Sequence, residues 1–197
     1  MTVGAEAGGT ADSGTAHMIL YTRVFVAGDT IPSFTPPDTN GGRAEVATFR
    51  RSAGSGWDMA FATGTDSTID TSHSAAATSD PGGATNDVLV AWACTNGNDI
   101  GTAHTAVAGS WTGCTLGTIS EADKGSTTAG NDSLTVIKYV PITAGTSTGN
   151  PSITWTWSGT ATANHPAAAA VYARLREQVA AAAARPPQVM SQYSGRW

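Results

Sequence analysis

The amino-acid sequence predicts an all-β protein, an antiparallel β-sandwich or jelly roll with a preceding partial repeat and an extended C-terminal arm. Segments rich in β-branched and aromatic residues recur along the 197 residues, and clusters of Gly, Asn, Asp, Pro and Ser separate them. One segment, Ile153-Thr-Trp-Thr-Trp-Ser, alternates apolar and polar residues strictly, as a half-buried strand does. Charged residues make up only 13% of the chain and hydrophobic residues 40%, which suits a rigid β protein rather than a solvated disordered tail.

The strand signals can be placed in order along the chain. Strands are expected at 18–27, 46–50, 57–63, 87–94, 133–142 and 153–157. Loops are expected where turn-forming residues cluster, at 63–70, 78–87, 95–101, 121–132 and 143–152. Eight or more short strands with such punctuation are typical of a sandwich or jelly roll.

The alternating segment 153–157 has two interpretations. Ile153, Trp155 and Trp157 point to one face of the strand, and the residues between them point to the other. These side chains either face the core or form an aromatic platform for sugar rings. A half-buried strand prefers large aromatic residues alternating with Thr, which favours the core.

An internal repetition decides the assignment of the Ala-rich region. Residues 165–184 have high helix propensity, with Pro166 placed as at the first turn of a helix. However, the phrase Ile31-Pro-Ser-Phe-Thr returns as Asn150-Pro-Ser-Ile-Thr, and the flanking segments follow in the same order. Because 46–50 reads as a strand, its counterpart 168–175 is expected to be a strand too. A short helix or ordered arm is then expected from 176 to 184, before Pro186-Pro187 ends any helix.

The repetition divides the chain into three parts. Residues 1–53 are expected to form a partial repeat, the last three strands of a unit, and residues 54–177 a complete β-sandwich unit. Residues 178–197 form a short helix or extended C-terminal arm. An incomplete unit leaves an unpaired sheet edge, which is costly unless the complete unit or a neighbouring subunit covers it.

The order of these segments resembles a β-sandwich repeat of tailed-bacteriophage virion structural proteins. The matching residues are 86–91 (NDVLVA), 110–111 (SW), 138–145, 153–157 and 167–176. The resemblance implies a component of the virion, which is a capsid decoration protein or a minor head or tail protein.

Composition argues against several other classes of protein. The net charge is −5, and the basic residues cluster only at Arg50-Arg51 and Arg174/Arg176, so no nucleic-acid partner is expected. No apolar run approaches the length of a membrane span, and the N-terminus lacks the pattern of a secretory signal. Neither a membrane nor a secretory route is therefore expected.

No catalytic or metal-binding set emerges from the residue spacing, so the chain is expected to be non-enzymatic and to have no cofactor. The histidines show no metal-site spacing, and neither Gly54-Ser55-Gly56 nor Gly109-Ser110-Trp111 forms a nucleophile elbow. Cys94 and Cys114 are expected to be free thiols, and a zinc site shared with His104 is the disfavoured alternative. Acidic loop residues are read as turn formers rather than Ca²⁺ ligands, and they are Asp66, Asp70, Asp80, Asp87, Asp99, Asp123 and Asp132.

The sequence therefore leads to a non-enzymatic virion protein that clamps neighbouring subunits, most simply as a capsid decoration or minor capsid protein. It would be assembled in the host cytoplasm as a homo-oligomer bound to major capsid protein or tail subunits. Its partner-binding residues are expected on the early strands and the C-terminal arm, and they are Tyr21, Phe25, Pro186, Pro187, Tyr193 and Trp197. The alternative is a minor tail or tail-tip protein that stacks glycans on Trp111, Trp155 and Trp157.

Overall fold

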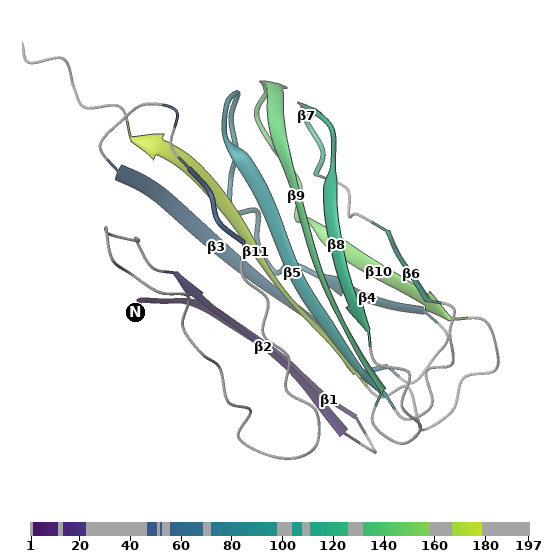
Figure 1. The fold of residues 1–197 in the computed structure, drawn as a ribbon. Coiled ribbons are helices and arrows are strands. Elements are labelled where there is room, and N and C mark those ends of the chain that lie inside the picture. Colours follow the sequence, from purple (N-terminus) through teal and green to yellow (C-terminus); the bar gives the residue numbers. More distant parts are fainter. Residues whose placement is uncertain are drawn as a thin grey trace, which may run out of the picture.

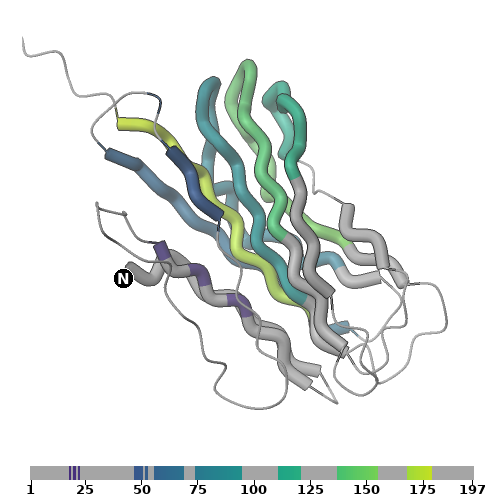
Figure 2. The backbone as a smooth tube through the Cα atoms, in the orientation of Figure 1, coloured from purple at the N-terminus to yellow at the C-terminus, as the bar shows by residue number. Residues whose placement is uncertain are grey.

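The computed structural model confirms the all-β prediction. It describes residues 2–11, 14–22, 47–50, 52, 56–68, 72–97, 104–107, 111–125, 132–157 and 167–178, whose backbone is traced in Figure 2. Within these ranges there are eleven strands and no helix. The strands are β1 (Thr2–Ala11), β2 (Gly14–Thr22), β3 (Gly56–Asp66), β4 (Ser72–Ala76), β5 (Val88–Gly97), β6 (His104–Val107), β7 (Cys114–Leu116), β8 (Ser120–Gly125), β9 (Asp132–Gly145), β10 (Ser152–Trp157) and β11 (Ala167–Gln178).

The strands form a sandwich of antiparallel sheets with an additional hairpin layer. The central sheet has six strands in the order β3-β11-β5-β9-β7, with β8 also paired to β9. One face of this sheet packs against the three-stranded sheet β4-β10-β6, and the hairpin β1-β2 lies across the other face, over β3, β11 and β5 (Figure 1). The central sheet is therefore covered on both sides.

This double cover explains the Ala-rich sequence of β11. Every residue from Ala168 to Leu175 is buried, and successive side chains enter the two cores in turn. A strand that is buried on both faces shows a continuous apolar run rather than alternation, which is why its sequence also resembles a helix. The strand prediction for 168–175 is confirmed. The strand continues to Gln178, so residues 176–178 belong to β11 and not to the expected short helix or ordered arm. The rest of the arm lies outside the described residues.

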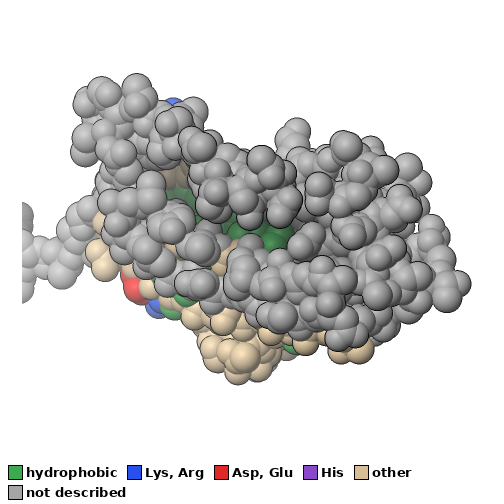
Figure 3. Space-filling view, turned by 90° about the horizontal axis from the view of Figure 1, so that it is seen from below, with side chains coloured by type: hydrophobic (Ala, Val, Ile, Leu, Met, Phe, Trp, Pro, Cys, Tyr) green, Lys and Arg blue, Asp and Glu red, His purple; other side chains and the backbone are tan. Residues whose placement is uncertain are grey.

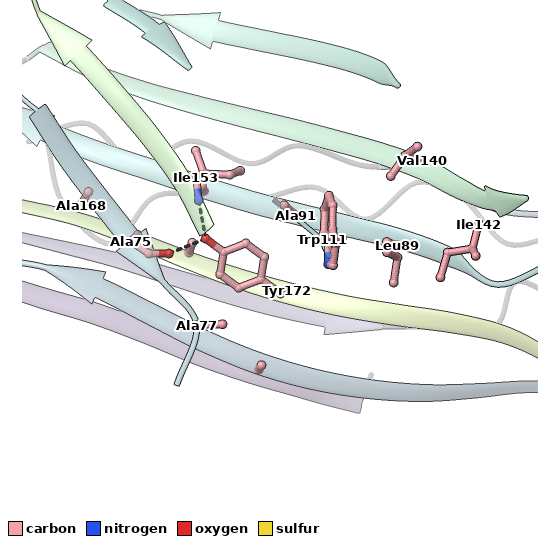
Figure 4. Packing of buried hydrophobic residues seen from close by; sticks show 13 residues of the cluster. Ala75, Ala77, Leu89, Ala91, Trp111, Val140, Ile142, Ile153, Ala168 and Tyr172 are labelled. Atoms are coloured by element: carbon pink, nitrogen blue, oxygen red, sulfur yellow. Dashed lines mark hydrogen bonds between the residues drawn. The ribbon is translucent and has the colours of Figure 1, made fainter. Parts of the chain in front are cut away.

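The two cores have different compositions. Between the sheets, many of the contacting residues are alanines, and the larger side chains Leu89, Ile142, Ile153 and Tyr172 fill the space between them (Figure 4). Beneath the hairpin the core is built from larger residues, namely Leu20, Val90, Trp92, Ile137, Val171 and Leu175, with Ala169 and Ala173 of β11. Small residues let the two sheets approach closely while keeping the interior filled.

Several sequence-based assignments need correction. Residues 47–50 form no strand; instead the ring of Phe49 packs edge-on against Tyr139, with ring centroids 5.6 Å apart. The expected loop 121–132 contains most of β8, and the loops after 63, 95 and 143 begin later because β3, β5 and β9 extend into them. Of the expected strand 18–27, residues up to Thr22 lie in β2 and the remainder lies outside the described residues.

Candidate functional site

The outer edge of β3 is the most distinctive candidate site for binding a partner. Strand β3 pairs with β11 in continuous register over its whole length, from Gly56 to Asp66. On its other side, the described backbone pairing lies near the end of the strand, where Thr78 N donates to Thr63 O at 3.0 Å and Gly64 bridges to Ala77. Within the described part of the chain, residues 56–62 have no strand partner on this side.

The direction of the free backbone groups follows from the bond to Thr63. Its carbonyl points away from β11, and groups on a strand alternate between its two edges with a period of two. The N–H and C=O groups of Trp57, Met59 and Phe61 therefore also point away from β11. The groups of the intervening residues, such as Ala60, point into the β11 ladder. This edge presents a row of donors and acceptors to a further strand.

The side chains along this edge are apolar and partly accessible. Trp57, Met59 and Phe61 are half-buried and pack on the rim of the core beneath the hairpin. Natural edge strands are commonly protected by Lys, Pro or a β-bulge, and the segment 56–62 has none of these. Its one charged residue, Asp58, is already paired with Arg174.

A glycine marks the point where the open edge ends. A Cβ atom on Gly64 would lie 2.3 Å from the carbonyl oxygen of Ala76, because the backbone of β4 passes directly beside it. No side chain fits in that space. Gly64 therefore allows the chain to close the end of the edge while the preceding residues remain open.

Two arginines near this edge are neutralised within the protein. Arg174 binds Asp58 at 2.8 Å, and its Nε atom is buried without a hydrogen-bond partner. Arg176 holds the buried carboxylate of Asp87 with two nitrogens, Nη2 at 2.7 Å and Nε at 2.9 Å. The hydrogen bonds to Asp87 raise the pKa of Arg176 above its ordinary value. These arginines stabilise the end of the sandwich and do not form a free basic patch.

The acidic loop residues with described side chains act as hydrogen-bond acceptors for nearby turns. Asp66 accepts from the N–H groups of Thr68 and Ser74, at 2.9 and 2.7 Å. Asp80 accepts from Gly82 N at 2.8 Å and from the hydroxyl of Ser147, and Asp87 accepts from Ala84 N at 2.8 Å. Among the described residues no three potential ligands gather into a metal site. Asp70 and Asp99, and the side chains of Asp123 and Asp132, lie outside the description.

The two cysteines lie on opposite faces of the central sheet, and neither is part of a disulfide. Cys94 packs on the core beneath the hairpin, and burial raises its pKa to about 12. Cys114 packs on the core between the sheets, and burial together with the charge of Asp80 raises its pKa. Such thiols hold their protons at neutral pH and are poor nucleophiles. Their separation by the sheet also rules out a zinc site that uses both.

Tyr172 links β11 to the opposite sheet. Its hydroxyl accepts a hydrogen bond from Ile153 N at 2.8 Å and donates one to Ala75 O, which joins the neighbouring strands β10 and β4 (Figure 4). Burial raises the pKa of this phenol, so it remains a neutral donor. Trp111 packs edge-on against its ring, with centroids 6.4 Å apart.

The position of Trp111 corrects one expected glycan contact. Its side chain is only 5% exposed and belongs to the core between the sheets, so no face of the indole is available to a sugar ring. Trp155 and Trp157 lie in β10, opposite Ala106 and His104 of β6, and their side chains lie outside the description.

The residues predicted to bind partners are mostly outside the described ranges. Tyr21 lies in β2 opposite Val3, and its side chain is not described. The other five predicted contacts lie wholly outside, namely Phe25, Pro186, Pro187, Tyr193 and Trp197. The described residues instead include an unpaired strand edge at β3. The sequence located this strand but contained no signal of its place at the border of the sheet.

Comparisons with known proteins found no relative of this chain. No protein-family model matches the chain, and no curated protein or solved structure matches it either. In the described ranges no helix has the length and apolar character needed to cross a membrane.

Proposed function

We propose that this protein is a non-enzymatic structural component of a tailed-bacteriophage particle. It binds neighbouring subunits, most simply as a capsid decoration or minor capsid protein that clamps them. The observation that carries the proposal is the free edge of β3, a regular strand with outward-pointing backbone groups at the border of a sheet covered on both faces.

An open edge on a rigid sheet is suited to strand addition. An extended segment of another subunit can hydrogen-bond to Trp57, Met59 and Phe61 without any change in the fold, because those groups already point outward. Each hydrogen bond contributes about 0.5–1.5 kcal/mol net, so one such contact is of modest strength. Repetition of the contact over a particle multiplies it through avidity.

The character of the surface supports the same interpretation. In the view of Figure 3 the described surface is mostly uncharged, and charged side chains appear at few points. Only 13% of residues are charged, and the described arginines of β11 are paired internally. Surfaces of this kind suit a protein packed among neighbours, and the resemblance of the strand order to phage virion repeats supports a tailed-phage particle as the assembly.

The proposal is tested on phage particles from the source of this sequence, purified by density gradient. Mass spectrometry is expected to find the chain in the particle band at a constant ratio to the major capsid protein through successive gradients. A chain that remains in the unassembled fraction would overturn the proposal.

The role of the β3 edge is tested in the same preparation with a proline variant. Met59→Pro removes an outward N–H and leaves the β11 ladder intact, so it is expected to lower occupancy on particles with little loss of folding. Thr118→Pro, an exposed position near the other border of the central sheet, is the matched control and is expected to retain occupancy. Equal occupancy of both variants would place the contact elsewhere on the protein.

A further inference from the structure

We propose that the partner at the β3 edge is a second copy of this chain. Two copies would pair through β3 in antiparallel orientation, about a two-fold axis at Met59, and join their central sheets into one continuous sheet. This inference rests on the proposed use of the β3 edge and adds the identity and register of the partner.

The register follows from the alternation of the backbone groups. Pairing about Met59 places Trp57 opposite Phe61 of the partner subunit and Met59 opposite its own copy. All three are residues whose N–H and C=O groups point outward, so every outward group of one copy meets an outward group of the other. Shifting the pairing by an odd number of residues would place outward groups against inward ones.

Other registers of the same parity are less favourable. A pairing about Asp58 would place the two Asp58 carboxylates directly opposite each other, which is repulsive. A pairing about Ala60 or Phe61 would require the carbonyl of Thr63, which already accepts from Thr78 N. Only the register about Met59 uses all the free groups and none of the occupied ones.

The side chains are also self-complementary in this register. Trp57 and Phe61 lie on the same face of β3, so the pairing forms two aromatic cross-strand pairs on either side of the axis. On the opposite face Asp58 lies across from Ala60 of the partner subunit, so no like charges meet. The same patch serves both copies, as a two-fold symmetric interface requires.

A charge-exchange experiment tests both the dimer and its register. Sedimentation equilibrium of the wild-type chain is expected to show a concentration-dependent dimer. Met59→Lys and Met59→Glu each place like charges opposite each other at the axis, so each is expected to weaken dimerisation at least about tenfold. An equimolar mixture pairs Lys with Glu, because position 59 faces itself, and is expected to restore most of the association.

Matched controls separate the edge from general charge effects. Thr115→Lys and Thr115→Glu change an exposed position on β7, near the other border of the central sheet, and are expected to dimerise like the wild type. A wild-type chain that stays monomeric up to about 1 mM would overturn the proposal. So would a Lys/Glu mixture that associates no better than either variant alone.

Two cysteine variants test the dimer and its register if the charged variants fold poorly. Met59→Cys is expected to form a disulfide-linked dimer under mild oxidation, since Cα atoms of a directly opposed pair are about 5.5 Å apart. Phe61→Cys faces Trp57 of the partner subunit and is expected not to cross-link. Equal cross-linking of both variants would contradict the register.

The two proposals can fail separately. A monomer that still binds particles would refute self-pairing and leave the proposed function standing. A dimer that has the stated register but is absent from particles would refute the proposed function and leave self-pairing standing.

Discussion

Strands β3 and β11 are hydrogen-bonded neighbours of similar length, but they contribute to the protein in different ways. β11 has a strand on each side and a layer on each face, and every side chain from Ala168 to Leu175 is buried. β3 has a strand on one side only, and most of its side chains are half-buried. Both strands are largely apolar and differ mainly in position. The comparison teaches that apolar residues at the centre of this sheet are enclosed by the fold, whereas at its border they stay partly accessible, as the proposed contact requires.

The hydroxyl of Tyr172 shows how firmly β11 is fixed. It joins two strands of the opposite sheet through buried backbone groups that would otherwise lack this partner. Among the described residues, no side chain of residues 56–62 of β3 makes a hydrogen bond to the opposite sheet.

Removing Tyr172 is expected to have the largest effect on stability. Tyr172→Ala should lower the free energy of unfolding by about 3–5 kcal/mol, because it leaves a cavity between the sheets. Tyr172→Phe keeps the ring and should cost about 1–3 kcal/mol, because Ile153 N and Ala75 O lose their partner. Urea unfolding followed by fluorescence measures both values. Wild-type stability of Tyr172→Phe would show that the bridge does not contribute.

Interrupting the ladder between β3 and β11 is expected to rank second. Ala60→Pro removes an N–H that points into the ladder opposite Arg174, and leaves a carbonyl of β11 without its donor. The expected loss is about 2–3 kcal/mol in urea unfolding, combining a lost hydrogen bond with an unsatisfied buried group. A loss below that of Met59→Pro would mean that the directions assigned to the backbone groups are reversed.

The parts of this fold that could be predicted are those whose residues prefer strands. The segments at β3, β5, β9 and β10 contain β-branched and aromatic residues, and their strands were expected with ends displaced by a few residues. β11 was expected from the internal repetition, since its own Ala-rich run fits a helix equally well. Burial on both faces, which is a tertiary property, removes the alternation that would have identified it.

Other parts could not be predicted because pairing, not propensity, determines them. β1 is rich in Gly and Ala, and β8 contains Glu, Asp, Lys and Gly, yet β1 pairs with β2 and β8 pairs with the longer strand β9. The segment 47–50 has suitable residues, but Phe49 contributes through its ring contact instead. The open edge of β3 depends on the order of strands in the sheet, which local sequence does not encode.

Alkaline pH is expected to weaken the centre of the sheet. Burial raises the pKa of Cys94 on β5 from 9.0 to about 12, so the folded state retains a proton that the unfolded chain loses. Its contribution is therefore complete below pH 9 and decreases as pH rises from 9 towards 12, by about 1 kcal/mol between pH 8 and pH 10. Cys94→Ala should reduce this loss in urea unfolding at the two pH values. An unchanged pH dependence would exclude Cys94 as its source.

The smallest effect on stability is expected from Met59→Pro, the change that is expected to weaken the proposed contact. Met59→Pro removes an N–H that points away from β11, and proline is tolerated in edge strands at such positions. The free energy of unfolding should fall by less than about 1 kcal/mol, well below the effect of proline at the adjacent Ala60. The measurement is urea unfolding at a protein concentration low enough to keep the chain monomeric, because dimerisation would otherwise add to the apparent stability. Should Met59→Pro destabilise the monomer as much as Ala60→Pro, the outer groups of β3 already have partners within the chain, and the edge is closed.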